Sequence, residues 1–159
     1  MVGTLVNPRF ATPAVTEQVV AFADLSGYHR VICSRLSPEE TFAFLGEYYA
    51  TVQRALEGSA GKIVKFIGDA ALIVFPAADA KPAVAALHNL KAAVDAFLAQ
   101  SGHDSRLRVK AHVGQVAAGP IGSGELERFD VCGLAVNQAA LLADEEWNLS
   151  AELKAKIGT

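Results

Sequence analysis

Two aspartate residues of this chain adjoin apolar runs, and carboxylates in such places can bind a metal ion. Asp24 follows the β-branched run of residues 19–23, which predicts a strand. Asp69 lies in the short turn between the apolar runs 62–66 and 70–75, which predict a β-hairpin. If the strand pairs with the hairpin, the two carboxylates converge at one edge of a sheet. Two hard anionic ligands, with room for water and phosphate oxygens, suit Mg²⁺ or Mn²⁺.

The spacing of these aspartates also allows readings without a metal. Asp is a common turn residue because its side chain hydrogen-bonds nearby backbone, which would account for Asp69. An aspartate at the end of a strand, such as Asp24, is often a helix cap or a surface charge. Both alternatives stay open on spacing alone.

The residues that follow Asp24 favour a phosphate-binding loop. Gly27 lets the backbone approach a ligand closely, and the N–H groups of the loop would point at phosphate oxygens. Two metal ions beside such a loop form the arrangement used for in-line phosphoryl chemistry. The loop consists of Leu25, Ser26, Gly27 and Tyr28.

A helix with a clear start signal follows this loop. Ser37 is expected as the N-cap, Pro38 as the first helical residue and Glu40 as the capping-box partner. The apolar period continues to about Glu57, and the glycine-containing residues 58–61 end it.

The rest of the chain alternates between strands and helices. Interleaved elements that include a hairpin predict an α+β fold, with a mostly antiparallel sheet covered by helices on one face. Residues 1–17, with mixed polarity and two prolines, are expected to be an N-terminal tail, and residues 18–159 a single domain. The remaining elements are a helix over 79–100, strands over 106–118 and 128–132, and helices over 135–143 and 150–157, the last capped by Ser150.

Composition excludes several classes of protein. The 159 residues are 52% hydrophobic and carry a formal net charge of −3, which argues against a general nucleic-acid binder. No apolar run approaches the length of a membrane span, and the N-terminus does not resemble a secretory signal, so a cytoplasmic location is expected. Cys33 and Cys132 are expected to be reduced thiols.

Three segments together resemble the class III nucleotidyl cyclase catalytic domain, the adenylate/guanylate cyclase homology domain. They are FADLSGY (22–28), KIVKFIGDAALIVFP (62–76) and RVKAHVGQVAAGPIGSGELERFDVCGLAVNQAALLA (108–143), in the order and spacing of that family. The resemblance implies a ferredoxin-like α+β core. It also implies a head-to-tail dimer, with active sites at the interface built from both chains.

The resemblance implies a role for each matching residue. Asp24 and Asp69 match the aspartates that bind two metal ions, Mg²⁺ or Mn²⁺, and the loop 25–28 matches the segment that wraps the triphosphate. Lys65 and Asp130 match the residues that read adenine, where guanylate cyclases typically carry Glu and Cys. The chemistry fits ATP, because Lys donates to the ring N1 acceptor and Asp accepts from the exocyclic amine, whereas guanine reverses that pattern.

The segment after Asp130 both matches and departs from the family. Asn137 matches the residue that orients the ribose, and would be the catalytic residue on this segment. Four residues later the family has an arginine that stabilises charge on the α-phosphate, and this chain has Leu141 on the same helix face. Loss of such a cation can cost about 10²–10³ in rate. Arg128, two residues before Asp130, is a nearby basic residue that would have to reach over to replace this arginine. A smaller departure is His29 after Tyr28, where the family commonly has Ser or Thr after Phe.

The C-terminal end is a second departure. The family usually continues with two more strands that bring a lysine to the triphosphate, and this chain ends at Thr159. The expected fold is therefore a cyclase core that is shortened at its C-terminus.

Two functions from different classes follow. The first is a metal-dependent adenylate cyclase in cyclic-nucleotide signalling, which converts ATP into 3′,5′-cyclic AMP and pyrophosphate. It would work as a homodimer or, where another chain supplies the missing arginine, as a hetero-dimer. The alternative is a catalytically impaired cyclase-like module that only binds nucleotide or only dimerises.

Overall fold

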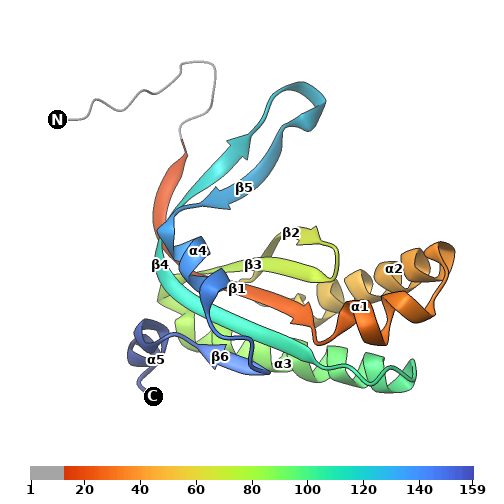
Figure 1. The fold of residues 1–159 in the computed structure, drawn as a ribbon. Helices are drawn as coiled ribbons and strands as arrows, with labels where there is room; N and C mark the ends of the chain where they lie inside the picture. Colours follow the sequence, from red (N-terminus) through yellow and green to blue (C-terminus); the bar gives the residue numbers. More distant parts are fainter. Residues whose placement is uncertain (1–12) are drawn as a thin grey trace.

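A twisted six-stranded sheet forms the centre of the fold in the computed structural model, which describes residues 13–159 (Figure 1). Its main path has the order β2-β3-β1-β4-β5, and β6 pairs with β4 outside this path. All neighbours are antiparallel except β4 and β6, which are parallel. The strands are β1 (Ala14–Leu25), β2 (Lys62–Ile67), β3 (Ala70–Pro76), β4 (Leu107–Ile121), β5 (Arg128–Cys132) and β6 (Trp147–Leu149).

The first strand is longer than its apolar run predicts. Strand β1 begins at Ala14, so residues 14–17, which were expected in the tail, belong to the sheet. They pair with residues 115–118 of β4, which is longer still, beginning with Ala14 opposite Ala118. The side chains at this end of β1 are exposed, so the strand extends here because it pairs with a long neighbour. Sequence periodicity does not reveal such pairing. The rest of the expected tail, residues 1–12, lies outside the described residues.

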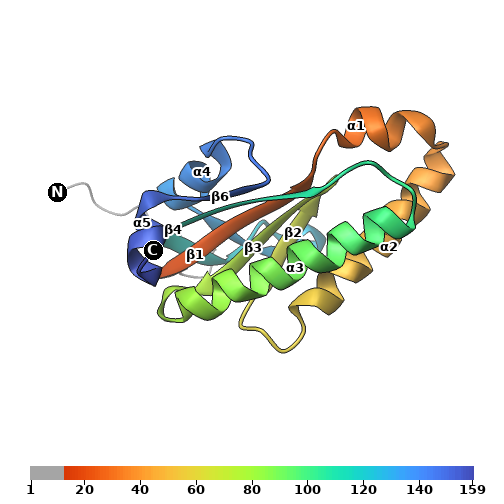
Figure 2. The same cartoon turned by 90° about the horizontal axis from the view of Figure 1, so that it is seen from below.

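Two long helices, α2 (Pro38–Leu56) and α3 (Ala80–Gln100), cover one face of the sheet (Figure 2). The predicted capping box at the start of α2 is confirmed. The Ser37 hydroxyl accepts a hydrogen bond of 3.1 Å from the Glu40 N–H, and the Glu40 carboxylate accepts one of 2.8 Å from the Ser37 N–H.

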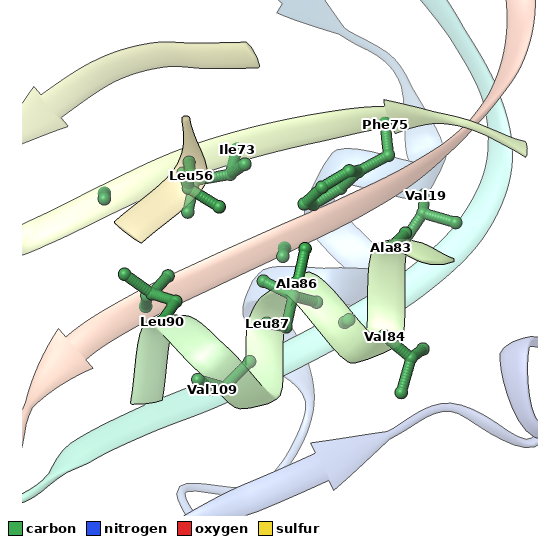
Figure 3. Packing of buried hydrophobic residues seen from close by; sticks show 14 of the residues in the cluster. Val19, Leu56, Ile73, Phe75, Ala83, Val84, Ala86, Leu87, Leu90 and Val109 are labelled. Atoms are coloured by element: carbon green, nitrogen blue, oxygen red, sulfur yellow. The ribbon is translucent and has the colours of Figure 1, made fainter. Parts of the chain in front are cut away.

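The main hydrophobic core lies between these helices and the sheet. Figure 3 shows Leu87 and Leu90 of α3 facing the sheet, in the same buried cluster as Val19, Ile73 and Val109. Leu87 is 0% exposed, so its truncation to Ala would cost about 2–5 kcal/mol. This core holds β1 and β3 in place, and these strands lead to the two aspartates.

Helix α4 (Leu134–Leu141) covers the opposite face, so the expectation that all helices lie on one face is wrong. Ala135 and Ala139 pack on Val20 of β1 and Val116 of β4, in a second and smaller cluster. Alternate residues of β1 therefore face different helices, since successive side chains of a strand point to opposite faces. The sequence pattern gives the helix but not the face it covers.

The shorter elements complete the chain. Helix α1 (Tyr28–Val31) follows β1 directly after Gly27, and α5 (Ala151–Ile157) begins with Ser150 as N-cap, as predicted. Within residues 13–159 no disulfide forms, because Cys33 and Cys132 are both free. No helix in the described part of the chain is long and apolar enough to cross a bilayer.

Candidate active site

The two aspartates predicted to share a metal lie side by side. Asp24 is the penultimate residue of β1, and Asp69 lies in the turn between β2 and β3. Because β1 pairs with β3, the backbone N–H of Leu25 reaches the Asp69 carboxylate and donates a hydrogen bond of 3.0 Å to Oδ2. The expected convergence at one sheet edge is confirmed. A role in metal binding stays a prediction.

Two tyrosines of α2 hold the turn that carries Asp69. The hydroxyl of Tyr48, a fully buried side chain, donates a hydrogen bond of 2.9 Å to the Asp69 carbonyl. The Tyr49 hydroxyl donates one of 2.5 Å to the Gly68 carbonyl, and its ring stacks on Phe66 at 3.8 Å between centroids. No local signal in the sequence indicates that either tyrosine supports the turn.

Arg108 is a further site residue that the sequence does not single out. It lies directly opposite Asp24 in the register of β1 and β4. Its Nε and Nη2 lie 2.7 Å and 2.6 Å from Asp24 Oδ1. This ion pair is largely buried, with side-chain exposures of 27% for Arg108 and 18% for Asp24. The pairing depends on strand register, so no local sequence signal reports it.

The environment of Asp69 disfavours its charge. Burial is the strongest effect and raises the pKa of Asp69, and the nearby Asp24 carboxylate raises it further. Hydrogen bonds from backbone N–H groups, including that of Leu25, and the positive charge of Arg108 act in the opposite direction. Burial prevails, so the pKa of Asp69 lies above the usual range of an aspartate.

The pair has the donor atoms that a hard divalent cation needs. Within residues 13–159, no hydrogen bond or ion pair is formed by Asp24 Oδ2, and no ion pair by Asp69 Oδ1. A carboxylate oxygen of each side chain is thus free of ion pairs within the described residues. No group of three or more His, Cys, Asp or Glu side chains in the described residues is arranged to hold a metal. Mg²⁺ and Mn²⁺ need no larger group, because one or two carboxylates suffice when water and phosphate oxygens complete the coordination. The two aspartates fit such an ion.

The predicted phosphate loop has fewer amide groups to offer than its length suggests. The Leu25 N–H already donates a hydrogen bond to the Asp69 carboxylate, and the Ser26 N–H donates one of 2.9 Å to the Arg106 carbonyl. Gly27, at φ 63°, turns the chain into α1, a conformation that glycine adopts without strain. The amides of Gly27 and Tyr28, at the start of α1, are therefore the ones that suit a phosphate group.

Lys65 and Asp130, far apart in sequence, form an ion pair. The Lys65 Nζ lies 2.7 Å from Asp130 Oδ2, which joins β2 to β5 across the curved sheet. A second contact beside it places the Lys62 ammonium 3.3 Å from the centroid of the Phe129 ring. Desolvation opposes ionisation of Asp130. The hydrogen bonds from Lys65 and the Val131 N–H, together with the positive charge of Lys65, outweigh desolvation and lower the pKa of Asp130.

A mostly apolar hollow of about 480 Å³ lies along the paired ends of β4 and β5, and Asp130 forms part of its wall. Its walls include Ala117 and Gly119 of β4 and Val131 and Cys132 of β5. Asp130 is thus a charged hydrogen-bond acceptor in the wall of a mostly apolar hollow.

Asn137 and Leu141 lie one helical turn apart on α4, and both are exposed. The Leu141 side chain has an exposed fraction of 85%. Within residues 13–159, no hydrogen bond or ion pair joins Asn137, Lys65 or Asp130 to the two aspartates. One chain therefore brings together the aspartate pair and, separately, the Lys65–Asp130 pair.

Comparison with protein families gives one match that covers most of the chain. The sequence model of the adenylate and guanylate cyclase catalytic domain matches residues 11–146. An uncharacterized protein of Mycobacterium tuberculosis is 32% identical over 127 residues, which are 79% of this chain and 22% of that protein. An adenylate cyclase of Anabaena cylindrica is 28% identical over 142 residues, 84% of this chain and 28% of the relative. The chain thus spans about a quarter of the length of these relatives.

Solved structures show the same fold. The adenylyl cyclase CyaB from P. aeruginosa superposes with a TM-score of 0.85 at 20% identity, over 93% of this chain and 83% of that one. The guanylate cyclase domain of RhGC from Catenaria anguillulae, solved with GTP, gives a TM-score of 0.81 at 22% identity, over 91% and 84% of the two chains. Sequence identities this low support the fold alone.

Proposed function

Since the chain belongs to the adenylate and guanylate cyclase catalytic domain family, we propose that it is a metal-dependent adenylate cyclase domain of low activity. The proposed reaction converts ATP into 3′,5′-cyclic AMP and pyrophosphate for cyclic-nucleotide signalling. In this proposal two copies form each site, which takes Asp24 and Asp69 from one copy and Lys65, Asp130 and Asn137 from the other.

The observation that carries the choice of ATP is the 2.7 Å ion pair between Lys65 and Asp130. The pair presents a donor beside an acceptor, which is the pattern that the N1 and the exocyclic amine of adenine require. Guanine presents a donor at N1 and an acceptor at O6, so this pair would face it with the wrong groups. The lowered pKa of Asp130 keeps this acceptor ionised at neutral pH.

The aspartate pair supports the phosphoryl chemistry. Mg²⁺ or Mn²⁺ bound there would supply the positive charge that activates the ribose 3′-oxygen and stabilises the leaving pyrophosphate. Arg108 holds the carboxylate of Asp24 in place, and the Leu25 N–H holds that of Asp69. Both contacts are present without substrate. The Gly27 and Tyr28 amides would bind phosphate oxygens.

The low activity in the proposal rests on Leu141. An exposed leucine cannot stabilise negative charge on the α-phosphate, and a missing stabiliser of this kind lowers the rate by about 10²–10³. The same residue favours the second candidate function, a cyclase-like domain that binds ATP with little or no turnover. The slow cyclase differs from the ATP-binding domain in that it still positions the reacting groups of ATP. Such positioning accelerates a reaction even without the arginine.

The first test is analysis of products. The purified chain is incubated with ATP or GTP and Mn²⁺ or Mg²⁺, and cyclic nucleotides and pyrophosphate are quantified by mass spectrometry. We expect slow formation of cyclic AMP that disappears in Asp69→Ala, and faster formation, by about 10²-fold, in Leu141→Arg. The exposed position should tolerate arginine with little change in stability.

Leu134→Arg is the matched control for a gain of activity. Leu134 is also exposed, at 71%, and lies two helical turns before Leu141 on the same helix. An equal gain in both variants would indicate a general effect of positive charge. ATP binding with product only in Leu141→Arg would favour the binding module or a hetero-dimer, and neither binding nor product in any variant would overturn the nucleotide site.

A further inference from the structure

Lys110 is a lysine with an almost fully buried side chain, 10% exposed, on the face of β4 that α4 covers. Its ammonium group donates hydrogen bonds of 2.8 Å to the Ala140 carbonyl and 2.9 Å to Asp144 Oδ1. A buried ammonium group is retained only where its donors are satisfied. The two acceptors lie at the end of α4 and just beyond it, so Lys110 ties the sheet to that end of the helix.

The C-terminal end of α4 needs such a contact. The last carbonyl groups of a helix have no partners within the helix, and positive charge is favourable beside them. Helix α4 has only eight residues, which is too short to be stable alone. Its buried anchors are the small side chains Ala135 and Ala139, which contribute little apolar area.

We propose that Lys110, assisted by Asp144, is a positioning residue that fixes the C-terminal turn of α4 and with it the amide of Asn137. The inference rests on the proposed function, in which Asn137 orients the ribose. Asn137 lies one turn before the end of α4 that Lys110 holds. Loss of this clamp, the bonds from Lys110 to Ala140 and Asp144, would let α4 shift or rotate and would move Asn137 with it. A displacement of about 1 Å in a positioned group can cost roughly 10² in rate.

The geometry separates this role from direct replacement of the missing arginine. The Lys110 ammonium is buried and bonded to the backbone, whereas the Leu141 side chain is exposed. Asp144 also lies 3.8 Å from Arg108, but its side chain is 61% exposed, so this longer contact contributes less than the bond to Ala140.

The test compares Lys110→Met with Lys91→Met. Methionine keeps the length and the apolar stem of lysine and removes the ammonium group. Lys91 is a matched control, because its side chain is 17% exposed and also donates to a backbone carbonyl, that of Leu107, and to an aspartate, Asp95. Hydrogen exchange of the metal-free chain should rise about tenfold or more for the amides of residues 138–142 in Lys110→Met, and should not rise there in Lys91→Met.

The catalytic part is tested in a double-mutant cycle with Asn137→Ala. Lys110→Met should lower kcat by about 10- to 100-fold with little change in KM for ATP, and should have almost no further effect in the Asn137→Ala background. Unchanged exchange in α4 overturns the clamp. An equal fall in kcat in both backgrounds overturns the link to Asn137.

The failure of the proposed function would look different. If the native chain formed no cyclic nucleotide, the cyclase assignment would fall together with the link to Asn137, while the exchange experiment would still decide whether Lys110 clamps α4. The two results are therefore separable in one set of variants.

Discussion

The hydroxyl of Tyr48 on α2 donates a hydrogen bond of 2.9 Å to the backbone carbonyl of Asp69. The side chain of Tyr48 is fully buried between helix and sheet, so the bond anchors the hairpin turn to the main core. The position of the Asp69 carboxylate thus depends on how α2 packs against the sheet.

Tyr48→Phe should loosen this turn while it leaves the core packed. We expect a loss of about 1 kcal/mol in the free energy of unfolding, because the Asp69 carbonyl loses its partner in a buried place. Affinity for Mn²⁺, measured by isothermal titration calorimetry, should fall several-fold. Tyr49→Phe is the control, since its more exposed hydroxyl bonds Gly68 instead and should matter less. Equal metal affinity in native chain and Tyr48→Phe would contradict the anchoring role.

Asp69→Asn should stabilise the metal-free chain at neutral pH. The pKa of Asp69 is raised in the folded state, so the folded chain binds its proton more tightly than the unfolded chain does. The favourable contribution of Asp69 is therefore present below the unfolded pKa and is lost as pH rises through the folded pKa. Asparagine removes this loss, and its carbonyl can still accept the Leu25 N–H.

The measurement for Asp69→Asn is thermal unfolding as a function of pH with a chelator present. The gain in Tm over the native chain should be largest near pH 7 and should shrink toward the pKa of an ordinary aspartate, about 3.9. A gain that grows as pH falls would show that the sign of the shift is wrong. Addition of Mn²⁺ should stabilise the native chain and not the variant.

Arg108→Gln should increase the response of the chain to metal. Without metal, Asp24 loses its counter-charge, which should cost about 1–3 kcal/mol. An added cation replaces that charge, so the rise in Tm on addition of Mn²⁺ should exceed that of the native chain. Arg106→Gln is the control, because Arg106 is 61% exposed and lies 3.9 Å from Asp95. The same rise in Tm in the native chain, Arg108→Gln and Arg106→Gln would contradict the idea that Arg108 and the metal ion both neutralise Asp24.

The double substitution Lys65→Glu with Asp130→Cys should change the preferred nucleotide. In the proposed site Lys65 donates to adenine N1, and the substitution puts an acceptor in its place. ATP turnover should therefore fall at least tenfold and GTP should become the better substrate, as a reversed hydrogen-bond pattern requires. The Leu141→Arg background provides the sensitivity for this measurement of cyclic AMP and cyclic GMP. Unchanged preference would show that Lys65 and Asp130 do not read the base.

The single variant Lys65→Glu should be measured beside the double variant. It places two carboxylates in contact, and like charges there should weaken the junction between β2 and β5. Binding of both ATP and GTP should then fall. Retained ATP binding in this single variant would indicate that the base is held elsewhere.

Several elements could be predicted from the sequence because their signals are local. The cap and period of α2, the hairpin of β2 and β3, the range of β5 and the Ser150 cap of α5 each depend on residues a few positions apart. Strand β6 was missed, because three residues carry no period and are held by parallel pairing with β4. The face covered by α4 was wrong for a related reason, since its contacts lie on β1 and β4.

The sequence by itself indicated the candidate residues: the spacing of two apolar runs pointed to Asp24 and Asp69, and the resemblance to the cyclase domain pointed to Lys65, Asp130 and Asn137. Only the tertiary structure decided what surrounds them. Arg108 reaches Asp24 through the register of two strands, Tyr48 reaches Asp69 through helix packing, and Lys110 reaches α4 across the sheet. These partners are 21 or more residues apart in sequence, and pairing over such distances is chosen by the fold as a whole rather than by local propensity.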